Sequence, residues 1–211
     1  MFDLTQPLNA DTPRFPGDPE VHIDTIHKFA PWQISSLKMG THSGTHMDAP
    51  RHLIAEGAGI GAYGPDRLVG RGLVLDARGL DGNAAIPDTV LTRVTNVTWP
   101  GWFAVVCTGW DHYWSDGRYF RHPYLSAELA ARLVASNARL VAIDALSVDS
   151  TVDEGSAAHA LLLAADVLIA ENLCNVRLLD PAHPYSFAFL PLSLGEADGS
   201  PARVVAWDTL T

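Results

Sequence analysis

Two short apolar runs with a helical segment between them decide the fold class: Leu140–Asp144 (LVAID), Ser156–Ala165 (SAAHALLLAA) and Val167–Glu171 (VLIAE). The runs are rich in Val, Leu and Ile, which favours buried β-strands. Their order along the chain is strand, loop, helix, strand, which is typical of an α/β unit.

Further strands are predicted on both sides of this unit, over Gly72–Ala77, Phe103–Thr108 and Val204–Trp207. A second helix is predicted over Ser126–Asn137, because Ser126 can cap it and Glu128 suits the positive end of its dipole. The 17 Gly and 14 Pro residues are spread along the chain and favour many short strands and turns. Together these features predict a β-rich α/β domain.

The bulk composition sets limits on domain number and partners. A chain of 211 residues suits one domain over residues 1–211. The formal net charge is -10, and no run of Lys or Arg occurs. Nucleic acid and anionic membranes attract clustered cations, so neither is an expected partner. We expect a small-molecule substrate instead.

The compartment is inferred from what the sequence lacks. The first residues lack the basic segment and the following apolar segment that make up a secretory signal. No stretch approaches the roughly 20 apolar residues of a spanning helix. Cys107 and Cys174 are too few for a disulfide framework. A cytoplasmic location is therefore expected.

The chemistry is concentrated in one segment, His42–His52 (HSGTHMDAPRH). Within it, His42, His46, Asp48 and His52 are candidate ligands or proton carriers, since imidazole and carboxylate are common metal ligands. Gly and Pro argue against a regular helix here. In an extended stretch His46 and Asp48 share a face. The alternative is a hydrogen-bonded polar turn without an ion.

The same segment resembles the motif of the cyclase family of metal-dependent hydrolases, which contains bacterial kynurenine formamidase and isatin hydrolase. The resemblance implies a β-rich single domain of the swivelling β/β/α type. Other stretches of the chain resemble the family as well: residues 15–18 (FPGD), 108–111 (TGWD), 143–149 (IDALSVD), 190–192 (LPL) and 198–201 (DGSP).

The family's ligand set can be carried over residue by residue. His42, His46 and Asp48 would hold a first metal, and Asp48 would bridge to a second metal held by His159 and Glu171. Glu171 ends an apolar run, where an unpaired buried carboxylate is costly. Pairing with Arg or capping of a turn is the alternative for Glu171.

The resemblance leaves His52 as the free acid/base. Ligands that offer only nitrogen and oxygen atoms suit Zn²⁺ or Mn²⁺. One or two ions are expected, because isatin-hydrolase-like members of the family work with one metal. The expected reaction is hydrolysis of an amide bond by metal-activated water, in an arylformamide such as N-formylkynurenine or a related small aromatic compound. Hydrolysis of a lactam such as isatin, and lactone hydrolysis or cyclisation in secondary metabolism, are alternatives. A non-catalytic metal-binding module is a third possible function. Such a module would not need His52, because storage of a metal requires no proton transfer.

Two expectations concern surfaces. Phe15 matches an aromatic, typically Trp, that lines the substrate pocket of the formamidases; it is equally suited to anchor a turn or a subunit contact. The resemblance also implies a homodimer or higher oligomer. Four tryptophans offer apolar surface for the interface, unless they fill the core: Trp99, Trp102, Trp110 and Trp114.

Overall fold

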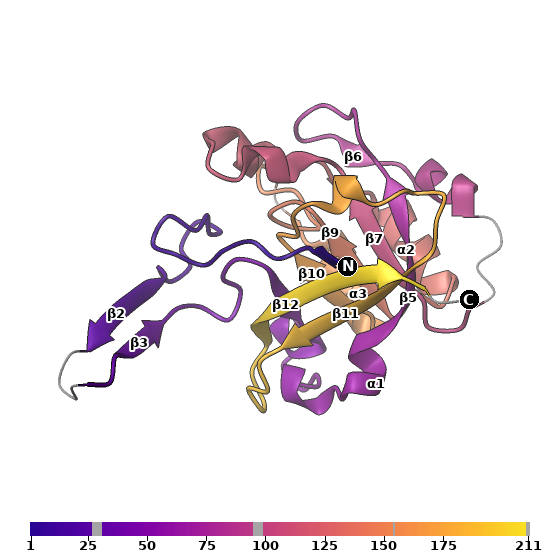
Figure 1. Ribbon diagram of the computed structural model, residues 1–211. Helices are drawn as coiled ribbons and strands as arrows, with labels where there is room; N and C mark the ends of the chain where they lie inside the picture. The colour runs from indigo at the N-terminus through magenta and orange to yellow at the C-terminus, as the bar shows by residue number, and fades with distance from the viewer. Residues whose placement is uncertain (27–30, 95–98, 154, 210–211) are drawn as a thin grey trace.

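One large sheet forms the body of the molecule (Figure 1). The computed structural model describes residues 1–26, 31–94, 99–153 and 155–209. In hydrogen-bonded order the strands of the sheet are β1 (Phe2–Asp3), β12 (Gly199–Asp208), β11 (Tyr185–Pro191), β5 (Val69–Asp76), β7 (Phe103–Cys107), β9 (Leu140–Ile143), β10 (Leu168–Glu171) and β4 (His46–Asp48). Strand β4 also pairs with β12. Within the described chain the sheet therefore closes into a seven-stranded barrel, with β1 outside the ring.

The barrel combines parallel and antiparallel pairing. Strands β5, β7, β9 and β10 are parallel neighbours, whereas the pairings through β11, β12 and β4 are antiparallel. Helix α2 (Ala127–Ala135) connects β7 to β9, and helix α3 (Ala157–Ala164) connects β9 to β10. Ser126 caps α2 by accepting a hydrogen bond from the backbone N–H of Leu129 at 3.1 Å. The predicted strand–helix–strand unit and the predicted cap are both confirmed.

Alternation of side chains divides the core into two layers. Along β7, Phe103 and Val105 pack with residues from the other barrel strands, such as Phe189. Ala104 and Val106 belong to a second cluster that includes Leu129 of α2. Successive residues of a strand point to opposite faces, so one set fills the barrel and the other packs beneath the helices.

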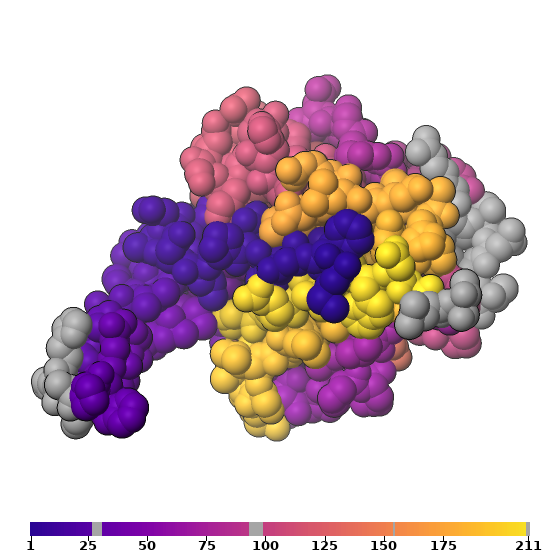
Figure 2. Space-filling view, viewed as in Figure 1, coloured from indigo at the N-terminus to yellow at the C-terminus, as the bar shows by residue number. Residues whose placement is uncertain are grey.

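Smaller elements are attached to this body. Helix α1 (Pro65–Leu68) precedes β5, and strands β6 (Ala85–Ile86) and β8 (Tyr124–Leu125) form a separate parallel pair. Strands β2 (His22–Ile26) and β3 (Ile34–Lys38) form an antiparallel hairpin. Figure 2 shows this hairpin, here called the arm, as a narrow projection from the barrel body.

The fold class predicted from the sequence is confirmed: the chain is a β-rich single domain of mixed α/β type. The predicted strands match β5, β7, β9 and β10 to within a few residues, and Val204–Trp207 is part of the longer β12. Strands β4 and β11 were not predicted. The first has three residues and no periodicity to detect, and the second ends at Pro191, which breaks the pattern.

The four tryptophans differ in burial, and their part in an interface between subunits stays a prediction. Trp102 is 1% exposed and lies in the core, and Trp99 and Trp110 pack against the same helix-side cluster. Trp114 packs edge-on against Tyr119. Large apolar side chains are also exposed on the arm. Among the described residues, no helix has the length and apolar content to cross a membrane.

Candidate metal centre and active site

The register of two strands places the candidate ligands on the outer face of the barrel. Met47 points into the barrel core, so His46 and Asp48 on either side of it point outward. Strand β4 pairs with β10 so that His46 lies opposite Glu171. Ala170 fills the barrel, so Glu171 also points outward. Three functional side chains therefore meet on the side of the sheet that α3 covers.

Glycines make the approach to β4 possible. Gly44 has a φ of 61°, and a Cβ there would lie 2.6 Å from the side chain of Leu8. A Cβ on Gly199 of the neighbouring β12 would lie 2.7 Å from Cε1 of His42. The absence of side chains at these positions lets the chain turn and leaves room for the His42 ring. The segment Pro50–His52 then forms one turn of 3₁₀-helix that carries His52.

The first donor group consists of His42, His46 and Asp48, whose ligand atoms all lie within 4.8 Å of one another. His42 Nδ1 is 2.7 Å from Asp48 Oδ1, and His46 Nε2 is 3.3 Å from the same oxygen. The stretch from His46 to Asp48 is extended, so the two side chains lie on one face, as expected for an extended stretch.

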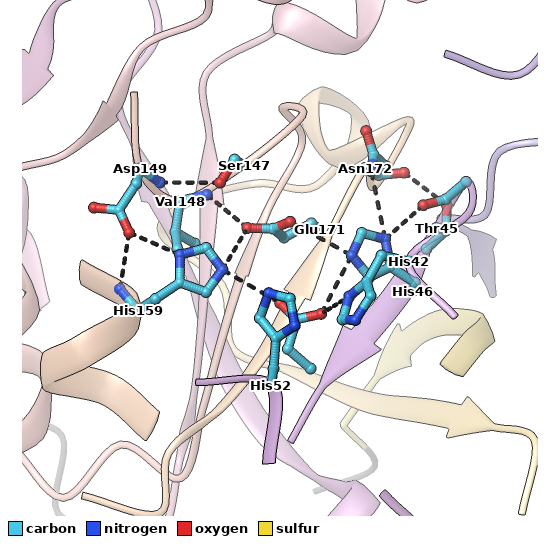
Figure 3. A network of polar contacts seen from close by, with 12 residues as sticks. His42, Thr45, His46, His52, Ser147, Val148, Asp149, His159, Glu171 and Asn172 are labelled. Atoms are coloured by element: carbon cyan, nitrogen blue, oxygen red, sulfur yellow. Dashed lines mark hydrogen bonds and ion pairs between the residues drawn. The ribbon is translucent and has the colours of Figure 1, made fainter. Parts of the chain in front are cut away.

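The second donor group consists of Asp48, His159 and Glu171, so it shares Asp48 with the first. His159 Nε2 lies 3.6 Å from Asp48 Oδ2 and 3.5 Å from Glu171 Oε1. The other oxygen of Glu171 is 3.5 Å from His46 Nε2. Figure 3 shows Glu171 between His159 on one side and His46 on the other. Asp48 and Glu171 thus span both groups.

Each buried imidazole is oriented through its other ring nitrogen. His46 Nδ1 donates to the carbonyl of Gly44 at 2.8 Å, and His159 Nδ1 donates to Asp149 Oδ2 at 2.7 Å. Asp149 also accepts from the backbone N–H groups of Ala158 and His159, at the first turn of α3. These bonds leave Nε2 of both rings facing the carboxylates, an arrangement typical of metal-ligating histidines.

The electrostatics of the group favour positive charge. Burial alone would lower the pKa of His46, but Asp48 and Glu171 outweigh burial and raise it to about 10. The pKa of His159 is likewise raised well above its usual value against burial, through Asp149 and Asp48. Burial would raise the pKa of Asp48, but His46 and His42 hold it well below the usual range. These interactions favour the ionised form of Asp48, which requires cations or protons beside it.

One buried oxygen supports a metal rather than protons alone. Asp48 Oδ2 is buried and accepts no hydrogen bond from the described residues. Leaving a buried charged acceptor unsatisfied costs free energy. A divalent cation held by Asp48, His159 and Glu171 would satisfy this oxygen, and the nitrogen and oxygen donors without thiolate match Zn²⁺ or Mn²⁺. The donor set fits a metal centre.

His52 stands apart from the buried ligands. Its side chain is 35% exposed, and its ring centroid lies 4.1 Å from that of His42 and 5.6 Å from that of His159. It lines a cavity of about 280 Å³ together with His42, His46, His159 and Glu171, whereas Asp48 is fully buried and does not line it. Phe15, which is 45% exposed, lines the same cavity and also a wider hollow beside it. The structure thus brings the predicted site residues together, and all of them except Asp48 line one cavity.

Two aspartates of the site were not singled out from the sequence. Asp149 holds His159, and Asp198 contacts His42 Nε2 at 2.9 Å and His52 Nδ1 at 3.5 Å. Both lie in short stretches that resemble the cyclase family, and this resemblance was the one feature of the sequence that could have indicated a role in the site. Their spacing from the histidines, up to 156 residues, carried no indication of contact.

A closed β-barrel with two adjoining sets of metal-type donors on its outer face defines the class of protein, and comparison with known proteins agrees with it. Residues 2–150 match the model of the family described as "Putative cyclase". The chain is 34% identical to kynurenine formamidase of Maricaulis maris, over 97% of this chain and 96% of that protein.

Solved structures show the same fold. A crystal structure of an isatin hydrolase bound to the product analogue thioisatinate superposes with a TM-score of 0.88 at 21% identity, covering 97% of this chain and 90% of that one. A structure described as a potential metal-dependent hydrolase with cyclase activity has a TM-score of 0.83 at 26% identity, covering 100% and 98%. The chain belongs to the cyclase family, and it is a hydrolase of that family.

Proposed function

We propose that the chain is a metal-dependent amidohydrolase that cleaves an arylformamide such as N-formylkynurenine. The observation that carries this proposal is the arrangement of two donor groups that share Asp48, beside an imidazole, His52, that neither group needs as a ligand. The similarity to kynurenine formamidase over nearly the whole chain supports the choice of substrate.

The metal assignment follows the two groups. His42, His46 and Asp48 would hold one ion, and Asp48, His159 and Glu171 would hold a second, with Zn²⁺ or Mn²⁺ as the ion. When bound, the metal supplies Lewis acidity, which polarises a carbonyl and makes water more acidic. Asp48 belongs to both groups, and Glu171 of the second group also contacts His46 of the first, so these two carboxylates would serve both ions.

His52 is the proposed acid/base. Its Nδ1 faces Asp198, so Nε2 is the nitrogen left for proton transfer. It would accept a proton from the attacking water as the water oxygen bonds to the formyl carbon. It would then deliver that proton to the aryl nitrogen as the carbon–nitrogen bond breaks, which yields formate and the free arylamine. An imidazole can both accept and donate a proton, which suits both steps.

The cavity favours a small substrate. About 280 Å³ is at the lower end of typical ligand sites. Phe15, Leu53 and Leu146 supply apolar surface, and Phe15 would contact the aromatic ring. Phe15 also lines the second hollow, which would leave space for a substituent on the ring.

We also propose a homodimer or higher oligomer assembled through the arm. Ile23 and Leu37 face each other across its strands and are 51% and 53% exposed, and Trp32 is 72% exposed. An isolated two-stranded hairpin is marginally stable in water, so contacts with a second copy would stabilise it. The arm follows residues 15–18 and precedes His42, so such contacts would adjoin the mouth of the cavity. Two free buried cysteines suit a cytoplasmic location.

The test is hydrolysis of three substrates by chain loaded with Zn²⁺ or Mn²⁺: N-formylkynurenine, isatin and an aryl lactone. We expect the highest kcat/KM for N-formylkynurenine. Faster opening of isatin would assign the lactam instead. Exhaustive chelation, verified by elemental analysis, should abolish turnover and lower the melting temperature, because the ligands would lose their shared partner. Full activity of metal-free chain would overturn the proposal.

The number of metals is tested separately with Glu171→Gln, which keeps the shape and removes the charge. Titration calorimetry should show loss of the weaker of two binding events and retention of the stronger one. Arg67→Gln, which is remote from the site and pairs with Asp166, is the matched control for change of a charged side chain. One binding event in both the unaltered chain and Glu171→Gln would leave a single metal at His42, His46 and Asp48.

A further inference from the structure

Asp198 holds a central position between two functional imidazoles. It lies in the turn between β11 and β12, far along the chain from the His42–His52 segment. Its Oδ2 is 2.9 Å from His42 Nε2 and 3.5 Å from His52 Nδ1, so one oxygen faces both rings.

The carboxylate is itself held in place from two directions. Its other oxygen, Oδ1, accepts a hydrogen bond from Thr41 Oγ1 at 2.9 Å. The backbone carbonyl of Asp198 accepts from the N–H of Ala49 at 2.9 Å, which joins the turn to the chain just after β4. Asp198 is therefore anchored to both ends of the segment that carries the candidate ligands.

An ionised carboxylate can only accept hydrogen bonds, so a ring nitrogen that bonds to it must carry a proton. Both ring nitrogens of His42 face carboxylates, Nε2 that of Asp198 and Nδ1 that of Asp48 at 2.7 Å, so by this rule both carry protons. A metal shared with Asp48 would replace the proton on Nδ1, whereas the proton on Nε2 would stay on the bond to Asp198. For His52 the same rule puts a proton on Nδ1 and leaves Nε2 for proton transfer. Carboxylates beside histidine ligands commonly fix the tautomer in this way.

We infer that Asp198 is a positioning residue that sets the tautomer and orientation of both His42 and His52, and so couples the ligand to the acid/base. The inference rests on the proposed function, because it assigns roles to these two histidines. It adds a residue that acts on both through a single oxygen.

One competing arrangement uses the same atoms. His42, His52 and Asp198 have ligand atoms within 4.8 Å of one another, so they form a third group that could itself hold a cation. In that case Asp198 would be a ligand. Metal stoichiometry separates the two assignments, since loss of a ligand removes a bound ion and loss of a positioning residue only weakens its binding.

The experiment compares Asp198→Asn with the unaltered chain, using Mn²⁺ or Zn²⁺ alone in calorimetry and N-formylkynurenine in kinetics. We expect unchanged metal stoichiometry, metal affinity lowered by about 10-fold and kcat at saturating metal lowered by about 10–100-fold, with KM little changed. Glu196→Gln is the matched control, because Glu196 lies in the same turn, carries the same charge and, within the described part of the chain, pairs with Arg51 at the surface. It should match the unaltered chain in all three measurements.

A double variant tests the action through His52. If Asp198 acts on the chemical step by positioning His52, then Asp198→Asn combined with His52→Ala should have the same kcat at saturating metal as His52→Ala alone. Its metal affinity should still fall, through His42. Thr41→Val keeps the carboxylate and removes its anchor, so it should show smaller changes in the same direction.

Several results would overturn the inference: Asp198→Asn with unaltered kcat and metal affinity, additive effects on kcat in the double variant, or loss of one metal equivalent. None of these concerns the proposed function itself. That function fails instead if the metal-free chain, or the His46→Ala variant, hydrolyses N-formylkynurenine at the full rate.

Discussion

Strands β3 and β4 are close in sequence but lie in opposite environments. Every residue of β4 is buried, and the strand pairs on both sides, with β10 and with β12. Every residue of β3 is exposed, and within the described chain its strand partner is β2. The candidate active site is thus built on a buried strand paired on both sides, whereas the described strands of the arm pair only with each other.

This difference indicates how each region depends on the rest of the molecule. A shift of β4 by one residue would move Met47 out of the core and turn the candidate ligands His46 and Asp48 into it. The pairing of β4 with β10 and β12 prevents such a shift. The arm has no buried face to set its position. We therefore expect changes on β4 to alter chemistry and stability, and changes on the arm to alter association.

The largest expected effect is that of His46→Ala. This ring is 3% exposed and contacts both carboxylates that span the donor groups. Its removal should release the metal and reduce kcat/KM by more than the roughly 10–100-fold typical of outer hydrogen-bond partners. Elemental analysis and kinetics measure the two effects. His22→Ala on the arm is the matched control and should retain both metal and activity; equal losses in the two variants would contradict the comparison.

His52→Ala should have the next largest effect. We expect kcat to fall by about 10²–10⁴-fold with metal content unchanged, because the proposed role of the residue is proton transfer and it lies outside the two buried donor groups. Elemental analysis of the purified variant provides the discriminating measurement. Metal loss as severe as in His46→Ala would make His52 a ligand.

Met47→Ala tests the barrel side of the same strand. Met47 is fully buried in the barrel core, so the free energy of unfolding should fall by about 2–5 kcal/mol. Chemical denaturation measures it, with Leu37→Ala on the exposed strand as the control. That control should change the free energy of unfolding by no more than about 0.5 kcal/mol. A similar loss in both variants would show that the arm is part of the folding core.

The smallest effect on stability and the clearest effect on assembly are expected from the arm. Replacing both Ile23 and Leu37 with Ser removes the apolar pair that faces across its strands. Sedimentation should show conversion to monomer at micromolar concentration, while denaturation of the monomeric barrel stays nearly unchanged. An oligomer that survives this double change would exclude the arm as its interface.

Much of the fold could be predicted from local patterns. The apolar runs of β7, β9 and β10 and the capped helix α2 are recognisable because burial on both faces of a strand and amphipathic packing of a helix leave strong signals in sequence. Closure of the sheet could not be predicted. It depends on β4, which has three residues, and on its long-range pairings with β10 and β12.

The site divides in the same way. By itself the sequence determined the ligand types, because His42, His46, Asp48 and His52 fall within one short segment, and resemblance to the cyclase family added His159 and Glu171. Only the tertiary structure decided that Asp149 and Asp198 orient those histidines, since they arrive from other loops. The physical reason is that a hydrogen bond depends on distance and direction in space, and residues 156 positions apart meet only after the barrel has closed.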